Sequence, residues 1–488
     1  MSYQTSGELV RTGLFIDGVA RSGAGDFPVI DPANPAVTVG LAAAASREQA
    51  LDAVAAAKKA QPEWAARTPA ERAAMLDASL GVLAALQDED ATILSLENGK
   101  IKRESVFDLL SFNRRFGLAT ALADQVERVT VLPGPPHETT VAYVPLGVIT
   151  IIVPYNWPLS ILGASLPFAL LAGNTVIVKP PPTTPLAITR IVQRVAEQLP
   201  AGVLNVVTGL DAEIGEALVK NDDVAMVSFT GSPGGGRRIM EMASNSLTKV
   251  MLELGGNDPA VIFDDAVLDT DALNRMFDGT FRTAGQICMA VKRIYVHRSR
   301  YREVVDGFAA LLEKTVLGHS LDEATTMGPL NNARQRDFVA GLVDEARAAG
   351  TQVRDFAALP REEGLREGYF LRPSLVLDPD PSLRVVQEEQ FGPTIPIIPF
   401  DDDAQAIEAA NDTWAGLCSS VWTADLTRAA EVGAKLTSGY VFINNHGPSS
   451  LDQRAPFGGV RGSGMGREMG IEGLREFMAT RSIALPKG

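Results

Sequence analysis

The sequence predicts an α/β protein with two mostly parallel β-sheets. Short, continuously apolar runs alternate with longer amphipathic stretches, and this alternation is typical of parallel strands that helices cover on both faces. The chain has 488 residues, of which 46% are hydrophobic, and this length exceeds what one ordinary core accommodates. We therefore expect two or three packed units, which can form a cleft between them.

The N-terminal part of the chain predicts long helices, followed by a hairpin. The Ala-rich segment 46–64 and the segment 69–87 are typical of helices, with Thr68 as the N-cap before Pro69. Residues 128–146 alternate like the two strands of a hairpin, and residues 479–485 predict another strand. Because exposed strands leave backbone groups that invite pairing with a second copy, we expect a homodimer or a homotetramer.

Two series of buried strands follow. The first comprises strands at 147–153, 175–178, 203–207 and 224–229, with helices over 186–198 and 211–220. The second begins near Asp258 and comprises strands at 260–263, 293–297, 374–377 and 394–399, with a helix over 301–315. Residues 139–178 carry no formal charge, but four prolines cut this region into pieces too short to cross a bilayer.

Composition and charge exclude several classes of function. The chain has 44 basic and 59 acidic side chains, and its net charge of −15 opposes binding to nucleic acid. Two cysteines and four scattered histidines argue against a disulfide framework and against a metal site. Residues 1–18 lack the basic start and apolar block of a signal peptide. We expect a cytoplasmic protein that binds neither nucleic acid nor membrane.

Two short patterns indicate chemistry. Gly285-Gln286-Ile287-Cys288 carries a thiol, which needs a lowered pKa or a nearby base to act as a nucleophile, and Glu253 or a water that it orders can serve as that base. Taken alone, a cysteine among apolar neighbours is more often an inert core residue. The glycine-rich run 231–236 follows a strand and opens a helix, where free N–H groups suit a pyrophosphate, although it lacks the Gly-Lys-Ser/Thr ending of a P-loop.

Seven segments occur in the order found in one family. They are Pro154-Tyr155-Asn156-Trp157-Pro158, Gly173-Asn174-Thr175 with Val178-Lys179-Pro180, Phe229-Thr230-Gly231-Ser232, Leu252-Glu253-Leu254-Gly255-Gly256, Gly285-Gln286-Ile287-Cys288, Glu388-Glu389-Gln390-Phe391-Gly392-Pro393 and Pro456-Phe457-Gly458-Gly459. Through these motifs the chain resembles the aldehyde dehydrogenase superfamily over nearly its whole length.

The resemblance implies a Rossmann-like cofactor domain, an α/β catalytic domain and a small β oligomerisation element. The expected ranges are 1–127 and 147–254 for the cofactor domain, 255–446 for the catalytic domain, 128–146 and 473–488 for the oligomerisation strands, and 447–472 for a return to the cofactor domain. The implied activity is the NAD- or NADP-dependent, non-acylating oxidation of an aldehyde to the carboxylic acid.

The resemblance also implies roles for single residues. Cys288 attacks the aldehyde and carries the acyl group as a thioester, the amide of Asn156 and the backbone N–H of Cys288 bind the oxyanion, and Glu253 activates the hydrolytic water. Lys179 resembles the lysine that holds the adenosine ribose, and Glu389 resembles the carboxylate that holds the nicotinamide ribose. The full set of implied cofactor contacts is Tyr155, Trp157, Lys179, Gly209, Gly231, Ser232, Leu254, Glu389 and Phe391.

Three positions depart from the family pattern. Pro182 stands where many NAD-preferring members have a glutamate, so the choice between NAD and NADP is open. Gly235 replaces a branched apolar residue that often packs on adenine, which implies a looser adenine cleft. Ser165 replaces a lysine that links to the catalytic glutamate through a carboxylate, matched here by Glu468, which implies a different route for the proton.

The substrate is constrained only loosely. If the family geometry holds, an apolar or aromatic aldehyde is favoured by the expected tunnel residues Trp157, Ile287, Met289 and Phe457. Arg282 and Arg454 flank two of the motifs, so a semialdehyde with a distal carboxylate is an alternative. Two further alternatives are a CoA-acylating dehydrogenase, in which CoA rather than water takes the acyl group, and a non-catalytic binding or structural protein on the same scaffold.

Overall fold

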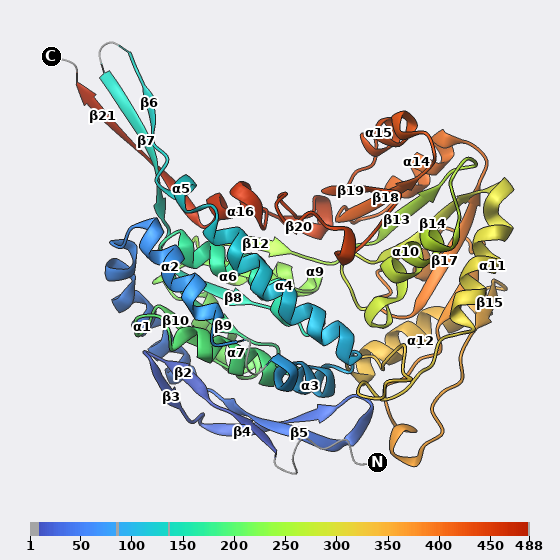
Figure 1. Ribbon diagram of the computed structural model, residues 1–488, viewed down its shortest axis with the longest axis horizontal. Helices are drawn as coiled ribbons and strands as arrows, with labels where there is room; N and C mark the ends of the chain where they lie inside the picture. Colours follow the sequence, from blue (N-terminus) through green and yellow to red (C-terminus); the bar gives the residue numbers. More distant parts are fainter. Residues whose placement is uncertain (1–8, 84–86, 135–136, 487–488) are drawn as a thin grey trace.

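The structure is a computed structural model that describes residues 9–83, 87–134 and 137–486 (Figure 1). One large sheet with its helices lies in the left half of the view, another lies in the right half, and a narrow set of strands projects from the upper left. Parts of the predictions lie outside the described residues: the start of the first domain at 1–8, helix residues 84–86, the hairpin connection at 135–136 and the chain end at 487–488.

The first sheet has eight strands. In spatial order they are β20 (Gly464–Met465), β12 (Lys249–Glu253), β11 (Val224–Thr230), β8 (Val148–Ile152), β9 (Thr175–Lys179), β10 (Leu204–Val206), β2 (Leu14–Ile16) and β3 (Val19–Arg21). The five strands from β12 to β10 are parallel, and β20 and β2 pair with them antiparallel. The four predicted strands of the first series are confirmed as β8, β9, β10 and β11.

Helices cover both faces of this sheet. One face packs against α1 (Arg47–Ala65), α8 (Asp211–Val219) and α9 (Pro233–Ala243). The other packs against α6 (Pro158–Leu171) and α7 (Leu186–Ala196), with α2 (Pro69–Leu80), α3 (Gln87–Asn98) and α4 (Lys102–Thr120) behind them. Thr68 caps α2 as predicted, because its side chain accepts from the backbone N–H of Glu71. The predicted helix to Gln87 was too long, since α2 ends at Leu80 and α3 begins at Gln87.

The second sheet has seven strands. Their order is β15 (Gln352–Asp355), β16 (Ser374–Leu377), β17 (Thr394–Phe400), β14 (Val291–His297), β13 (Asp258–Ile262), β18 (Cys418–Trp422) and β19 (Tyr440–Ile443). All pairs are parallel except β15–β16. One face packs against α10 (Thr270–Phe281) and α11 (Tyr301–Leu312). The other packs against α12 (Ala333–Ala348), α13 (Arg384–Gln387), α14 (Asp403–Asn411) and α15 (Leu426–Gly433). The four strands predicted for the second series are confirmed.

Two small sheets complete the fold. One consists of β1 (Val10–Thr12), β5 (Asn34–Ala44) and β4 (Gly25–Asp31), and the sequence patterns did not predict it. The other consists of β21 (Met478–Pro486), β7 (His137–Pro145) and β6 (Thr130–Leu132), which confirms the predicted hairpin and the predicted C-terminal strand, and it shows in addition that β21 pairs with β7. Two short helices, α5 (Ala123–Val126) and α16 (Gly470–Glu476), lie near the base of this projecting sheet (Figure 1).

The carboxyl ends of the parallel strands position the candidate site. The loops after β8, β9, β10 and β11 all leave the same edge of the first sheet, where ligands bind in open α/β sheets. The charge-free region 139–178 forms parts of β7, β8, α6 and β9. Within the described part of the chain, no helix is long and apolar enough to span a membrane. The residue boundaries proposed for the domains stay predictions.

Candidate active site

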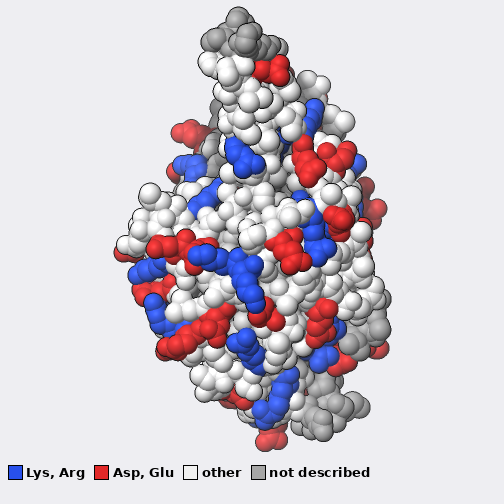
Figure 2. All heavy atoms as spheres, turned by 90° about the vertical axis from the view of Figure 1, so that its left-hand side faces the viewer, with Lys and Arg blue, Asp and Glu red and all other residues white. Residues whose placement is uncertain are grey.

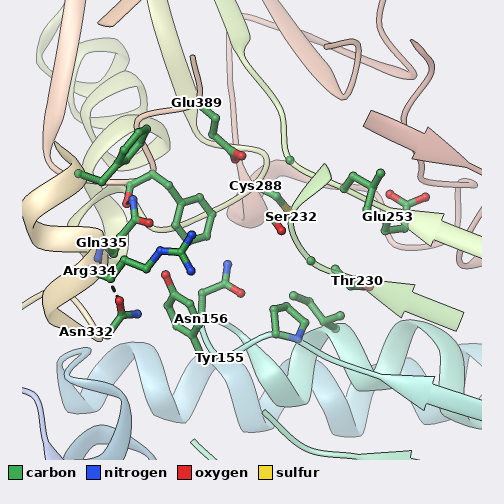
Figure 3. A pocket seen from close by; sticks show the side chains of 17 residues that line it. Tyr155, Asn156, Thr230, Ser232, Glu253, Cys288, Asn332, Arg334, Gln335 and Glu389 are labelled. Atoms are coloured by element: carbon green, nitrogen blue, oxygen red, sulfur yellow. Dashed lines mark hydrogen bonds between the residues drawn. The ribbon is translucent and has the colours of Figure 1, made fainter. Parts of the chain in front are cut away.

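A cavity of about 450 Å³ opens where the loops of the two large sheets meet. It brings together segments that are far apart in the sequence: the loop after β8, the loop after β11, the end of β12, the segment before β14, the start of α12 and the loop before β17 (Figure 3). Nine of the predicted site residues line it, namely Tyr155, Asn156, Gly231, Ser232, Glu253, Leu254, Cys288, Glu389 and Phe391.

Cys288 lies on a loop that has a strained backbone and is held by hydrogen bonds. The residues before it, Thr283, Ala284 and Gly285, have φ values of 54°, 53° and 74°, and left-handed backbone costs a non-glycine residue about 1–2 kcal/mol. The buried Lys292 holds this loop, because its Nζ donates to the carbonyl oxygens of Gly285 and Ile287, each at 2.9 Å. The loop therefore presents a partly exposed thiol to the cavity at a fixed place.

Asn156 faces the cavity with its amide held on one side. Its Nδ2 donates to the carbonyl oxygen of Gln286 at 2.8 Å, two residues before Cys288. An amide nitrogen has two N–H donors, and among the described residues only Gln286 accepts from this one, which leaves the second donor for a ligand in the cavity. The backbone carbonyl of Asn156 accepts from Lys100 Nζ at 3.0 Å, and Lys100 pairs with Asp108 at 2.7 Å with both side chains fully buried. This buried pair supports the loop that carries Asn156.

The surroundings of Cys288 favour the neutral thiol. Burial raises the pKa of the Cys288 thiol above its ordinary value, and the nearby carboxyl groups of Glu389, Asp258 and Glu253 raise it further, whereas Lys292 acts in the opposite direction. A thiol in this environment attacks an electrophile only if a base takes its proton.

Glu253 is the buried carboxyl group of the cavity. Burial raises its pKa well above the ordinary value, and repulsion from Glu468 adds to this, while Arg467 lowers it. Neither oxygen of Glu253 forms a close hydrogen bond with a described residue, and the backbone N–H of Gly459 nearby also lowers its pKa. A Cβ on Gly458 would lie 2.6 Å from Glu253 Oε1 and 2.8 Å from the backbone oxygen of Gly466, so a side chain there would crowd the carboxyl group. A carboxyl group with a raised pKa and free oxygens is suited to accept a proton near neutral pH.

A polar chain leads from Glu468 to Ser165. Burial raises the pKa of Glu468 to about 7, and its hydrogen bond with Ser165 and the charge of Arg115 oppose that shift. Ser165 Oγ donates to Glu468 Oε1 at 2.8 Å and lies 3.1 Å from the hydroxyl of Ser228. Ser165, at the position where the resemblance implied a lysine, thus contacts Glu468 without supplying a charge.

The opposite part of the cavity fits a nucleotide. Ser232 caps α9, where the glycines after Pro233 leave the backbone accessible, and a Cβ on Gly234 would meet nothing within 4 Å. Glu389 lies against the backbone of Gly255, where a Cβ would come within 1.9 Å of its Oε2. The sequence implied a looser cleft at Gly235, but a Cβ there would lie 2.7 Å from Phe229 Cζ, so the phenylalanine ring occupies that space.

Two predicted cofactor contacts lie at the same sheet edge but outside the cavity lining. Lys179 ends β9, and Gly209 precedes α8. The side chain of Lys179 is buried and its ammonium group forms an ion pair with Asp211.

The predicted tunnel residues lie in the core beside Cys288 rather than in the cavity lining. Trp157, Ile287, Met289 and Phe457 belong to the apolar cluster against which Cys288 packs. Trp157, which was also expected to contact the cofactor, packs edge-on against Phe107 with ring centroids 5.7 Å apart.

Neither arginine proposed for a substrate carboxylate lines this cavity. Arg282 forms two hydrogen bonds with Asp278, at 2.9 and 2.8 Å. Arg454 forms two with Asp452, at 2.9 and 2.7 Å. Both guanidinium groups therefore already have carboxylate partners.

One wall of the cavity was not predicted from the sequence. The start of α12 contributes Asn332, Arg334, Gln335 and Phe338, and further lining residues are Pro154, Ile161, Thr230 and Gly255. Asn332 caps α12, since its side chain accepts from the backbone N–H of Gln335 at 3.0 Å. An Asn before a helical stretch could have revealed this helix start. No local pattern indicates that the helix faces Cys288.

Known proteins of one family are similar to this chain over nearly its whole length. A profile of the aldehyde dehydrogenase family matches residues 19–483. Betaine aldehyde dehydrogenase of Bacillus subtilis (strain 168) is 33% identical over 476 residues, which cover 96% of each chain. Aldehyde dehydrogenase citD of Monascus ruber is 33% identical over 462 residues, covering 95% of this chain and 91% of that one. The crystal structure of betaine aldehyde dehydrogenase from Staphylococcus aureus in complex with NAD+ superposes with a TM-score of 0.93 at 31% identity, covering 98% of this chain and 95% of that chain.

Proposed function

We propose, from the premise that this chain belongs to the aldehyde dehydrogenase family, that it oxidises an aldehyde to the carboxylic acid with NAD+ or NADP+. The observation that carries the proposal is that Cys288, Asn156 and Glu253, from three separate segments, line one cavity. The acyl group is carried on Cys288 and released to water.

The residues at the sheet edge suit a nicotinamide dinucleotide. Ser232 and the accessible start of α9 would hold the pyrophosphate, Lys179 the adenosine ribose and Glu389 the other ribose. The relative from Staphylococcus aureus, whose structure contains NAD+, supports this assignment. When bound, the nicotinamide supplies the two-electron acceptor of the oxidation.

The first step is addition of the Cys288 sulfur to the aldehyde carbon. The S–C bond forms as the π bond of the carbonyl breaks, and the thiol proton passes to Glu253, directly or through a water. The raised pKa of Glu253 makes it a stronger base than an ordinary carboxylate. The new alkoxide is stabilised by the free N–H of Asn156 and by the backbone N–H of Cys288, and losing one such donor costs about 3 kcal/mol of barrier.

Oxidation leaves a thioester on Cys288, which water then hydrolyses. Glu253 removes a proton from that water, the C–O bond forms, and the thiolate leaves and is reprotonated. We place the exit of the proton at Glu468, whose pKa of about 7 suits a group that takes up and gives up a proton near neutral pH. The hydroxyls of Ser165 and Ser228 extend this route in place of the family lysine.

We propose an apolar or aromatic aldehyde as the substrate. Cys288 packs against an apolar cluster that contains Trp157 and Phe457, which supports this choice. Because Arg282 and Arg454 are already paired with aspartates, a semialdehyde with a distal carboxylate is the weaker alternative. Glu253 in the same cavity as the thiol favours water over CoA as the acyl acceptor.

The projecting strands β21, β7 and β6 are proposed to pair with a second copy of the chain. Figure 2 shows the side of the molecule from which these strands project, and the upper part, which the strands form, has few charged side chains. Large apolar side chains are exposed here at Val129, Val131, Leu132, Ile483 and Leu485. An exposed apolar patch on open strands is typical of an interface between subunits.

Steady-state kinetics test the proposal. The purified protein is assayed with aliphatic, aromatic and semialdehyde substrates and with betaine aldehyde, using NAD+ and NADP+, and the product is identified as free acid or acyl-CoA. We expect free acid, the highest kcat/KM with apolar or aromatic aldehydes, and no turnover by Cys288→Ala. Undiminished turnover by Cys288→Ala would refute the assignment of the nucleophile. No nucleotide reduction with any aldehyde would instead favour a non-catalytic protein on the same scaffold.

A further inference from the structure

The buried ammonium group of Lys179 forms an ion pair with the exposed carboxylate of Asp211. Lys179 is the last residue of β9, and Asp211 is the first residue of α8, which follows β10. Because β9 and β10 are parallel neighbours in register, their carboxyl ends bring the two side chains to the same sheet edge. The lysine side chain is 2% exposed and the aspartate side chain 79% exposed, so a ligand arriving from solvent meets the carboxylate first.

This pair matches the hydrogen-bonding needs of a vicinal diol. The ammonium group donates and the carboxylate accepts, while each ribose hydroxyl both donates and accepts. Lys179 Nζ has three N–H donors, and within the described part of the chain only Asp211 accepts from it. Two donors thus remain for a ligand, and the Asp211 carboxylate keeps free lone pairs.

Position 182 carries no carboxylate, and Asp211 supplies one at the same sheet edge. Proline has no side-chain acceptor and no charge, so position 182 supplies no carboxylate to hold a ribose 2′-hydroxyl. In dinucleotide sites an acidic residue binds that hydroxyl in NAD, whereas a cation accommodates the 2′-phosphate of NADP. The buried ammonium group of Lys179 at this edge is already paired with the carboxylate of Asp211.

We infer that Asp211 is the residue that selects NAD+ over NADP+ in this protein, by accepting a hydrogen bond from the adenosine ribose 2′-hydroxyl and repelling a 2′-phosphate. This inference rests on the proposed function, because it takes Lys179 as the ribose contact. A 2′-phosphate has no hydroxyl hydrogen to offer at that position and brings a charge of about −1.5 to −2 close to the aspartate.

The test measures nucleotide affinity directly, without turnover. The dissociation constants of NAD+ and NADP+ are determined by isothermal titration calorimetry for the full-length protein, for Asp211→Asn and for Glu213→Gln. Glu213 is a matched control, since it is an exposed carboxylate in the same first turn of α8. Circular dichroism and thermal unfolding establish that the variants fold.

The expected result is selective. The parent protein binds NAD+ at least about 30-fold more tightly than NADP+, and Asp211→Asn lowers this ratio about tenfold or more, mainly by tighter NADP+ binding, because one charge at close range is worth about a decade in affinity. Glu213→Gln leaves the ratio within about twofold, as expected for a screened surface charge.

Two results overturn the inference. One is a parent protein that binds NADP+ as tightly as NAD+, and the other is an Asp211→Asn variant with the same ratio as Glu213→Gln. Binding of neither nucleotide to the folded parent protein is a different outcome, because it refutes the proposed function and with it the inference. Failure of Asp211 alone therefore remains distinguishable from failure of the whole assignment.

Discussion

Removal of the Lys100 ammonium group should destabilise the protein far more than removal of a surface cation. Lys100 Nζ lies 2.7 Å from Asp108 Oδ2, and both side chains are fully buried. Lys100→Met leaves the Asp108 charge without its partner, which costs about 3–5 kcal/mol of unfolding free energy. The matched control is Arg298→Met, because Arg298 pairs with Asp401 at 2.6 Å but with side chains 58% and 59% exposed, and it should cost less than about 1 kcal/mol.

A double variant separates the charge from the packing. Lys100→Met with Asp108→Asn removes both charges but keeps an acceptor for the backbone N–H of Ser160, so it should recover at least about half of the loss. The assay is urea unfolding followed by circular dichroism, with kcat measured in parallel, because Lys100 also holds the Asn156 carbonyl. A cost for Lys100→Met no larger than that of Arg298→Met, or no recovery in the double variant, would show that the buried pair does not support this loop.

Three other predictions follow from the site and its surroundings. Glu253→Gln should lower steady-state kcat about 10²- to 10⁴-fold, because it removes the base of both the addition and the hydrolysis, and little acyl-enzyme should be visible by intact-mass spectrometry; full activity would exclude Glu253 as the base. Burial raises the pKa of Glu97 to about 8, so the folded state holds this proton more tightly than the unfolded one. The contribution of this proton to the free energy of unfolding is fully present below pH 4.5 and is lost as the pH rises through about 8. The midpoint of urea unfolding should therefore fall between pH 5 and pH 8.5, and Glu97→Gln should make this fall smaller. Arg334 is exposed at the cavity and pairs with no carboxylate in the described ranges, so Arg334→Gln should weaken nucleotide binding about three- to tenfold at low salt and by less at 0.5 M salt; an effect independent of salt would contradict an electrostatic role.

The strands of both large sheets could be predicted because their signal is local. A continuous apolar run such as 224–229 shows a strand buried on both faces, and β11 spans Val224–Thr230. The short outer strands escaped prediction, since β2 and β20 have only three and two residues and too little periodicity to stand out. The small sheet formed by β1, β5 and β4 was missed as well.

The candidate site could be predicted only in part. Cys288, Asn156 and Glu253 stand in short motifs, and the cavity brings the three together. The wall from α12 escaped because nothing in its own sequence says which helix lies against the loop of Cys288. Trp157 and Met289, which were expected to line a substrate tunnel, belong to the apolar cluster against which Cys288 packs, and their role stays a prediction.

The sequence by itself determined the order of strands and helices, the cluster of motifs and the absence of a charge at Pro182, since these depend only on residue type and on spacing along the chain. Only the tertiary structure decided which charges are already paired. Arg282 is neutralised by Asp278, one turn away on a helix, whereas Lys179 is paired with Asp211, 32 residues further along the chain. The second pairing exists because two parallel strands end at one edge of a sheet, and this long-range arrangement leaves no mark in the local sequence.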